Sequence, residues 1–75
     1  MSVNDEFKRF ITTLAYSGYN FTDSQKNHIE TFTRLETSNS NNTILTQIMQ
    51  SFVNETPDCY EKRKMQAVLN SSCIS

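Results

Sequence analysis

The chain has 75 residues, enough for a single helical domain over residues 1–75 that buries only about 60% of the surface its unfolded form exposes. Its formal net charge of -1 provides no positive field that would gather nucleic acid, so we do not expect non-specific DNA binding. A hydrophobic content of 36%, with five Phe and three Tyr, exceeds that of disordered chains and predicts a folded protein.

The first predicted element is a helix over about residues 5 to 17. Its apolar residues recur at i, i+3, i+4, i+7 and i+8 and form one stripe: Phe7, Phe10, Ile11, Leu14 and Ala15. Asn4 is expected to cap the first turn, and Asp5 and Glu6 suit the positive end of the helix dipole. Gly18 can adopt the left-handed conformation that ends a helix.

A second helix is predicted to start at Thr22, because Thr22 and Gln25 have the spacing of a capping box. Its apolar content is thin, with Ile29 and Phe32 and with Leu35 beside them. We therefore expect this helix to cover the core from one side or to share a face between subunits.

Residues 37–43 contain no apolar side chain and predict a break between helices. Asn41 or Asn42 is then expected to cap a third helix. This helix carries an unusually wide apolar stripe, which suggests contacts on two sides: Ile44, Leu45, Ile48, Met49, Phe52 and Val53.

The fourth predicted helix starts with Thr56 as its cap and Pro57 at its first position, where the missing amide hydrogen costs nothing. Four apolar or aromatic residues are predicted to point inward: Tyr60, Met65, Val68 and Leu69. Three cations are predicted to point mostly outward: Lys62, Arg63 and Lys64. No segment alternates for long enough to make a strand. The sequence therefore predicts an all-α fold, a small bundle of three to four short helices.

Self-association is expected, because a core of this size rarely supplies more than roughly 3 to 5 kcal/mol. A homodimer, or a partner that completes the core, would cover the remaining apolar surface. The first six residues are acidic and lack the basic and apolar regions of a secretory signal, and no stretch approaches 18 apolar residues. We therefore expect a cytoplasmic protein that does not enter a membrane.

Catalysis is not expected, because groups able to act as acid, base, nucleophile or metal ligand are sparse. His28 is the only histidine and lies on the polar side of the second helix. Cys59 and Cys73 form neither a CxxC pair nor a zinc motif, so we interpret both as reduced thiols. A nucleophilic pair of His28 with either cysteine would lack an orienting third group. A single Gly leaves no phosphate-binding loop, and we predict no cofactor.

The basic run Lys62-Arg63-Lys64 is interpreted as a solvated helix face. Its alternative role is phosphate contact in a helix-turn-helix protein, but the preceding Pro57-Asp58-Cys59 lacks the usual polar readers at the start of a recognition helix.

Protein binding is the predicted function, through apolar stripes wider than one small core requires and through the adjoining basic run. The candidate partner-binding residues are Phe52, Val53, Tyr60, Lys62, Arg63, Lys64, Met65 and Leu69. The alternative interpretation is that the apolar members are internal core.

The segment Asn42–Ile48, followed by a polar turn and a last helix with Arg63, Lys64, Val68 and Leu69, resembles the YmgB/AriR family of small enterobacterial regulators. The end of the first helix at Tyr16-Ser17-Gly18 is also similar, and the likeness covers most of the chain, with a shorter second helix. The resemblance implies a non-enzymatic helical homodimer that acts as a connector, binding a response regulator and adjusting biofilm and acid-stress genes.

Two other functions remain open. A phage or mobile-element inhibitor that occludes a host protein fits the small size and the many Asn residues. A small DNA-binding repressor would rely on the basic run and would bind DNA with a steep salt dependence.

Overall fold

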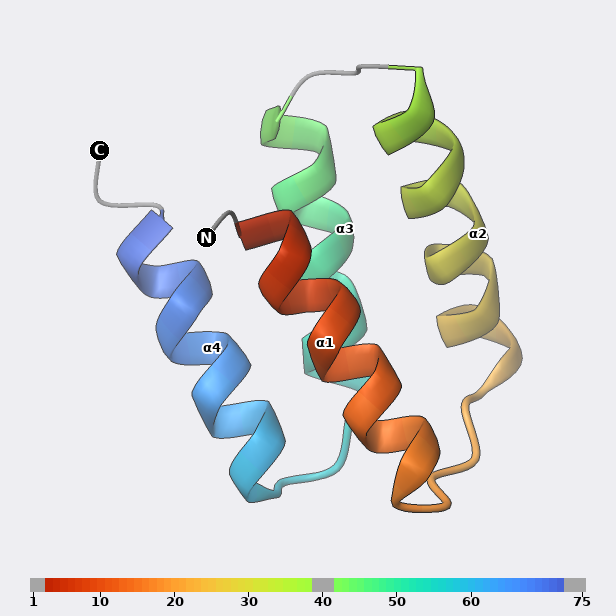
Figure 1. The fold of residues 1–75 in the computed structure, drawn as a ribbon, viewed down its shortest axis with the longest axis vertical. Helices are drawn as coiled ribbons and strands as arrows, with labels where there is room; N and C mark the ends of the chain where they lie inside the picture. Colours follow the sequence, from red (N-terminus) through yellow and green to blue (C-terminus); the bar gives the residue numbers. More distant parts are fainter. Residues whose placement is uncertain (1–2, 39–41, 73–75) are drawn as a thin grey trace. The chain divides into compact units, whose positions relative to one another are not determined.

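The computed structural model describes residues 3–38 and 42–72, which form four helices and no strand (Figure 1). The helices are α1 (Val3–Tyr16), α2 (Asp23–Thr37), α3 (Asn42–Glu55) and α4 (Tyr60–Ser72). The prediction of an all-α fold with three to four short helices is confirmed.

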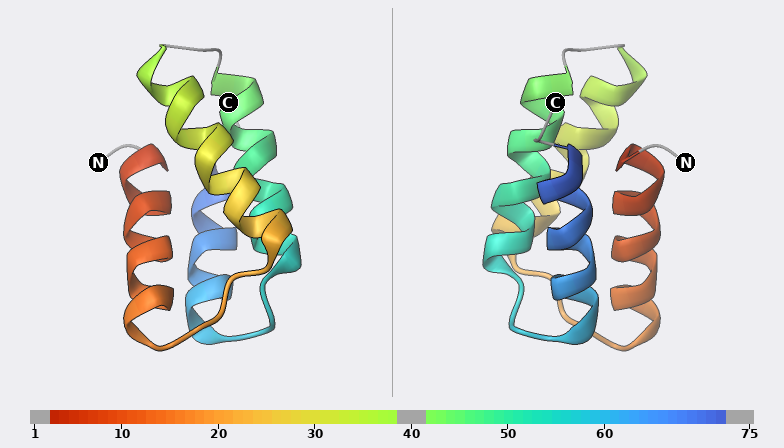
Figure 2. Two further views of the ribbon diagram at one scale, coloured as in Figure 1. Left: turned by 90° about the vertical axis from the view of Figure 1, so that its right-hand side faces the viewer. Right: turned by 90° about the vertical axis from the view of Figure 1, so that its left-hand side faces the viewer.

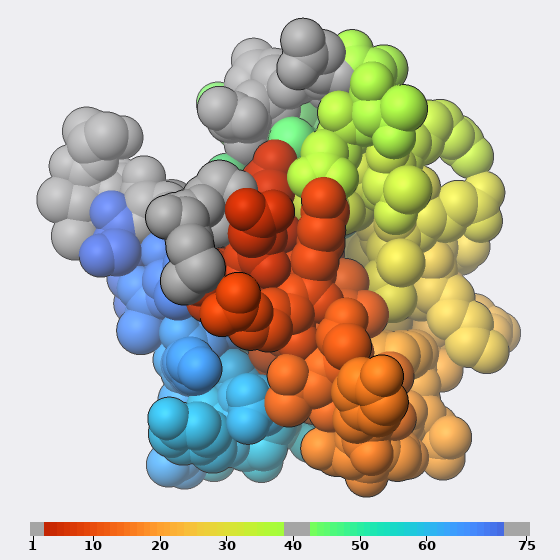
Figure 3. Space-filling model, in the orientation of Figure 1, coloured from red at the N-terminus to blue at the C-terminus, as the bar shows by residue number. Residues whose placement is uncertain are grey.

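The four helices divide into two compact units, each a pair of helices. One unit combines α1 with α4 and therefore joins residues 1–20 to residues 56–75, while the other is the continuous segment Phe21–Glu55 with α2 and α3. Within each unit the two helices run antiparallel (Figure 2). Side chains of α1 and α4 lie against one another in the space-filling view (Figure 3). The expectation of a single domain remains a prediction.

Helix α1 buries three of the five residues of the predicted stripe, Phe7, Phe10 and Leu14, whereas Ile11 is half-buried and Ala15 is exposed. The rings of Phe7 and Phe10 are stacked, with centroids 6.3 Å apart. Asn4 was predicted as the cap, and this is wrong, because α1 already includes Val3. Asn4 therefore lies within the first turn of α1, not at the capping position before it.

The end of α1 is a Schellman motif. The amide of Tyr19 donates to the carbonyl of Leu14, and the amide of Gly18 donates to the carbonyl of Ala15, each at 3.1 Å. Gly18 has a φ of 85°, the left-handed conformation that this motif requires. The predicted role of Gly18 is confirmed.

We expect Gly18→Ala to lower the free energy of unfolding by about 1 kcal/mol, because a side chain is disfavoured at positive φ. A Cβ at this position would meet no atom within 4 Å, so the loss reports backbone conformation alone. Urea denaturation followed by circular dichroism measures it. Gly18→Asn is the matched control and should lose less, since Asn tolerates this conformation. Equal stability of the Ala variant would contradict the assignment.

The capping box at the start of α2 is present as predicted. The Gln25 amide donates to the Thr22 hydroxyl, and the Thr22 amide donates to Gln25 Oε1, both at 3.1 Å. Gln25 is fully buried, so this side chain is held within the unit by its reciprocal bonds. Of the apolar residues of α2, Phe32 is buried while Ile29 and Leu35 are half-buried.

Helix α3 supplies most of the core of the second unit. Its buried residues are Leu45, Met49, Phe52 and Val53. The ring of Phe52 packs on Phe21, which precedes α2, with centroids 5.8 Å apart. Ile44 is 45% exposed, so the wide stripe is covered only in part.

The predicted break at residues 37–43 is narrower in the structure, since Thr37 still belongs to α2 and α3 begins at Asn42. Residues 39–41 lie outside the described part of the chain. The proposed cap at Asn41, and the Asn42 side chain offered as its alternative, are therefore not described.

Helix α4 begins at Tyr60, and the prediction of a start at Thr56-Pro57 is wrong. Residues 56–59 form bends, and the amide of Arg63 donates to the carbonyl of Cys59 at 3.1 Å. Cys59 is thus where the chain enters the helix.

Tyr60 was predicted to point inward and is instead 73% exposed. At about 100° per residue it lies roughly 140° around the helix from Met65 and about 180° from Leu69, so it cannot share their face. Met65 and Leu69 are buried as predicted, and Val68 is half-buried.

Among the helices of the described residues, none combines the length and the apolar character needed to cross a membrane.

Candidate binding groove

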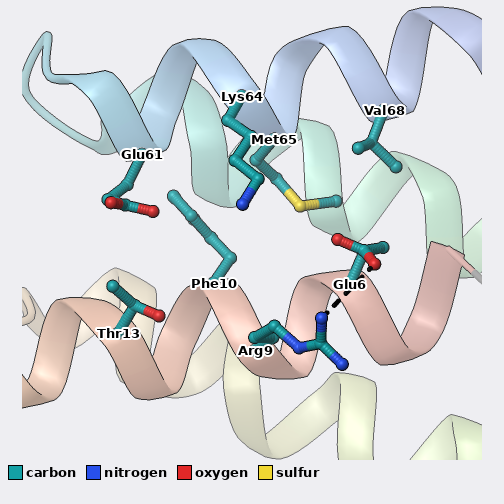
Figure 4. Close-up of a pocket in the computed structure, with 8 residues that line it drawn as sticks. All are labelled: Glu6, Arg9, Phe10, Thr13, Glu61, Lys64, Met65 and Val68. Atoms are coloured by element: carbon teal, nitrogen blue, oxygen red, sulfur yellow. Dashed lines mark ion pairs between the residues drawn. The ribbon is translucent and has the colours of Figure 1, made fainter.

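A groove runs between α1 and α4 within the first unit (Figure 4). It holds about 320 Å³ of unfilled space, part of it open to solvent. Apolar residues form its floor: Phe10, Met65 and Val68. Polar or charged residues of both helices border this floor: Glu6, Arg9, Thr13, Glu61 and Lys64. We call this site the α1–α4 groove.

Helical spacing brings together the three apolar residues that form the floor of the groove. Phe10 comes from the buried stripe of α1, and Met65 and Val68 come from α4 at a spacing of three. Phe10 and Met65 are almost fully buried, whereas Val68 is half-buried and can still be reached. The groove therefore presents a narrow apolar surface between two helices.

Charges of both signs border this floor. Glu6 and Arg9 of α1 form an ion pair at 4.0 Å, and their side chains are 19% and 61% exposed. Glu61 and Lys64 border the groove from α4 (Figure 4). A pair at this distance with an exposed guanidinium contributes little stability.

Two exposed tyrosines mark one end of the first unit. Tyr16 is the last residue of α1 and is 88% exposed, and Tyr60 is the first residue of α4. Because α1 and α4 run antiparallel, both residues lie at the same end of the helix pair. Exposed tyrosines are frequent at protein interfaces, where they contribute large apolar area and a hydroxyl group.

The basic run does not form a uniform face. Arg63 donates two hydrogen bonds to Asp58, at 2.8 Å and 3.1 Å, and so ties the loop before α4 to its first turn. These hydrogen bonds, and then the guanidinium charge, lower the pKa of Asp58 from its ordinary value of 3.8. The same hydrogen bonding and the charge of Asp58 raise the pKa of Arg63 further. Arg63 is therefore occupied within the chain.

A pH dependence follows from this pair. Since the folded pKa of Asp58 is lowered, the pair stabilises the fold above the unfolded pKa, and this contribution is lost as the pH falls through the folded value. We expect Asp58→Asn to be slightly less stable than the parent at about pH 6, and we expect this difference to disappear as the pH falls below the folded pKa of Asp58. Denaturation across this range measures the difference.

Arg63→Gln is the matched variant for this test. The losses from Asp58→Asn and Arg63→Gln should not add in the double variant, because one pair is removed in all three. Additive losses would mean that the pair makes no contribution.

The structure brings only two of the eight predicted partner-binding residues to the groove, Lys64 and Met65. Phe52 and Val53 are buried in the second unit, and Leu69 is buried in the first, in agreement with the alternative interpretation of these residues as core. The remaining three are also in the first unit but do not line the groove: Tyr60, Lys62 and Arg63.

His28 is half-buried and contacts Glu55, not solvent alone. Its Nδ1 atom lies 3.0 Å from Glu55 Oε2 without forming a regular hydrogen bond. The contact becomes an ion pair when the imidazole is protonated, and it links α2 to the last residue of α3. His28 therefore has a partner within the fold, Glu55, that the sequence did not indicate.

Cys59 is a half-buried free thiol at the entry to α4, and Cys73 lies outside the described residues. Within the described segments no group of three or more His, Cys, Asp and Glu side chains could hold a metal ion.

The residues that α1 contributes to the groove were missed by sequence analysis. The periodicity identified Phe10 as apolar and the outer face of α1 as polar, but it could not show that α4 packs beside α1. Glu6, Arg9 and Thr13 become site residues only through that pairing. A possible signal was the excess of charged residues next to the stripe on both terminal helices.

No protein-family model, no curated protein and no solved structure matches this chain.

Proposed function

We propose that this chain is a small non-enzymatic regulatory protein that acts by binding another protein through the α1–α4 groove. The observation that supports the proposal is the groove itself, an apolar floor bordered by charged side chains on two helices. Protein interfaces combine such an apolar centre with a polar rim. The exposed Tyr16 and Tyr60 extend the surface at one end of the same unit.

The finer form of the proposal is a connector that binds a transcriptional response regulator in the bacterial cytoplasm, as the resemblance to the YmgB/AriR family implies. An inhibitor encoded by a phage or mobile element would use the same groove to cover a host protein. The identity of the bound protein distinguishes these two functions.

DNA binding receives less support from the geometry. Arg63 is engaged by Asp58, and Lys62 is half-buried, so the basic run does not offer three exposed cations on one face. Replacement of all three cations by Ala would abolish a salt-dependent DNA shift if the chain were a repressor.

The test compares the parent with two variants in a pull-down from bacterial lysate, with retained proteins identified by mass spectrometry. Thr13→Arg places a bulky side chain in the groove. Thr12→Arg is its matched control, because Thr12 is the neighbouring, exposed residue of the same helix and does not line the groove. Melting of both variants checks that they fold.

We expect at least one protein to be retained by the parent and by Thr12→Arg but lost by Thr13→Arg. Retention that Thr13→Arg does not change would refute the groove as the binding site. Recovery of nuclease-sensitive material alone would favour DNA binding. Light scattering is measured in parallel, and a dimer that only Thr13→Arg dissociates would mean that the groove binds a second copy of the chain.

A further inference from the structure

A half-buried imidazole joins the two helices of the second unit. His28 of α2 has its Nδ1 atom 3.0 Å from Oε2 of Glu55, the last residue of α3, and the two side chains are 28% and 33% exposed. The Nδ1 atom is shielded from solvent and has no hydrogen-bond partner among the described residues. A shielded polar atom without a hydrogen bond costs free energy, whereas a protonated ring beside a carboxylate is attracted to it. Protonation of His28 would therefore turn a costly contact into a favourable one.

The place of this contact in the fold also favours a positive charge. The last turn of α3 contains no basic residue. Its free carbonyl groups and the helix dipole make this end of the helix negative, and Glu55 adds a further negative charge there. His28 supplies from α2 the cation that α3 lacks.

No other charged group in the described part of the second unit faces the imidazole. Glu55 is the only charged residue in the sequence of α3. In α2 the charged residues within one turn of His28 are Lys26 and Glu30, which are both exposed and lie about 160° around the helix. Glu30 is paired with Arg34 at 2.9 Å. The electrostatic effect of protonating His28 therefore depends chiefly on Glu55.

We propose that His28 and Glu55 form a pH-dependent clasp that holds α2 to α3 more tightly when the imidazole is protonated. Because the ion pair exists only in the folded chain, it stabilises the fold below neutral pH, and this contribution is lost as the pH rises and the proton leaves. It is also lost in stronger acid, where the carboxylate is protonated. Glutamate and histidine are ordinarily both charged between roughly pH 4 and pH 7. The clasp belongs to the second unit and does not depend on the proposed function.

The composition of the chain makes the test selective. His28 is its only histidine, and histidine is the side chain whose charge ordinarily changes between about pH 7.5 and about pH 5.5. Urea denaturation at these two pH values gives the unfolding equilibrium constants of the parent, of His28→Gln, of Glu55→Gln and of the double variant. Asn27→Gln is the matched control, because it introduces the same residue at the neighbouring, exposed position of α2.

We expect His28→Gln and Glu55→Gln each to raise the unfolding equilibrium constant, relative to the parent, about threefold more at the lower pH than at the higher. The pH-dependent loss in the double variant should not exceed that in either single variant, because one pair is removed in all three. Asn27→Gln should show no pH-dependent difference from the parent.

Two results would overturn the inference. One is a loss from His28→Gln that is equal at the two pH values or greater at the higher one, since protonation would then add no stability. The other is a pair of pH-dependent losses that add in the double variant, because His28 would then respond to charges other than that of Glu55.

Discussion

Phe52→Ala is expected to lower the free energy of unfolding by about 3 to 5 kcal/mol, because it removes a fully buried ring and leaves a cavity. The ring packs on Phe21 with a centroid distance of 5.8 Å, so its loss removes the contact between α3 and the segment entering α2. A loss of this size is comparable with the whole stability of a small domain. The variant should therefore be largely unfolded near room temperature, as followed by circular dichroism.

Ser51→Ala is the control for this change. Ser51 precedes Phe52 in α3 and is exposed, so its truncation should shift stability by no more than about 0.5 kcal/mol. If Phe52→Ala melts like Ser51→Ala, the assignment of Phe52 to the core is wrong.

Leu69→Ala is expected to cost about 2 to 5 kcal/mol in the first unit, where Leu69 is 1% exposed. It follows Val68 on α4, so its truncation should also loosen the helix that forms one side of the α1–α4 groove. Chemical denaturation measures the loss of stability, and hydrogen exchange locates it in α1 and α4.

Asn70→Ala is the matched control, since Asn70 follows Leu69 and is exposed. Its stability should stay within about 0.5 kcal/mol of the parent. Unchanged protection of α1 and α4 amides in Leu69→Ala would show that this side chain does not hold the pair together.

The sequence predicted well those features of the fold that depend on interactions between neighbouring residues. Gly18 and the Thr22–Gln25 capping box depend only on neighbouring residues, and both have the predicted geometry. The predicted start of α4 was wrong because Pro57 was taken as the first helical residue. In the structure the Asp58 side chain accepts hydrogen bonds from Arg63, and the helix begins after Cys59.

The candidate site was largely beyond sequence reasoning, because it depends on which helices pair. A hydrophobic stripe shows which face of a helix is covered but not by which neighbour. Lys64 and Met65 were identified on α4, yet the α1 side of the groove, with Arg9 and Glu6, required the pairing of the first helix with the last.

That pairing gives the chain a nested connectivity with a consequence for the order of folding. The α2–α3 unit is continuous and makes local contacts, whereas α1 finds its neighbour only across the whole of Phe21–Glu55. Contacts between distant segments form at a higher entropic cost, and a folded insert brings their ends together. We therefore expect the α2–α3 unit to fold before α1 pairs with α4 when the unfolded chain is allowed to refold. The α1–α4 groove, and with it the capacity to bind a partner, would then form last.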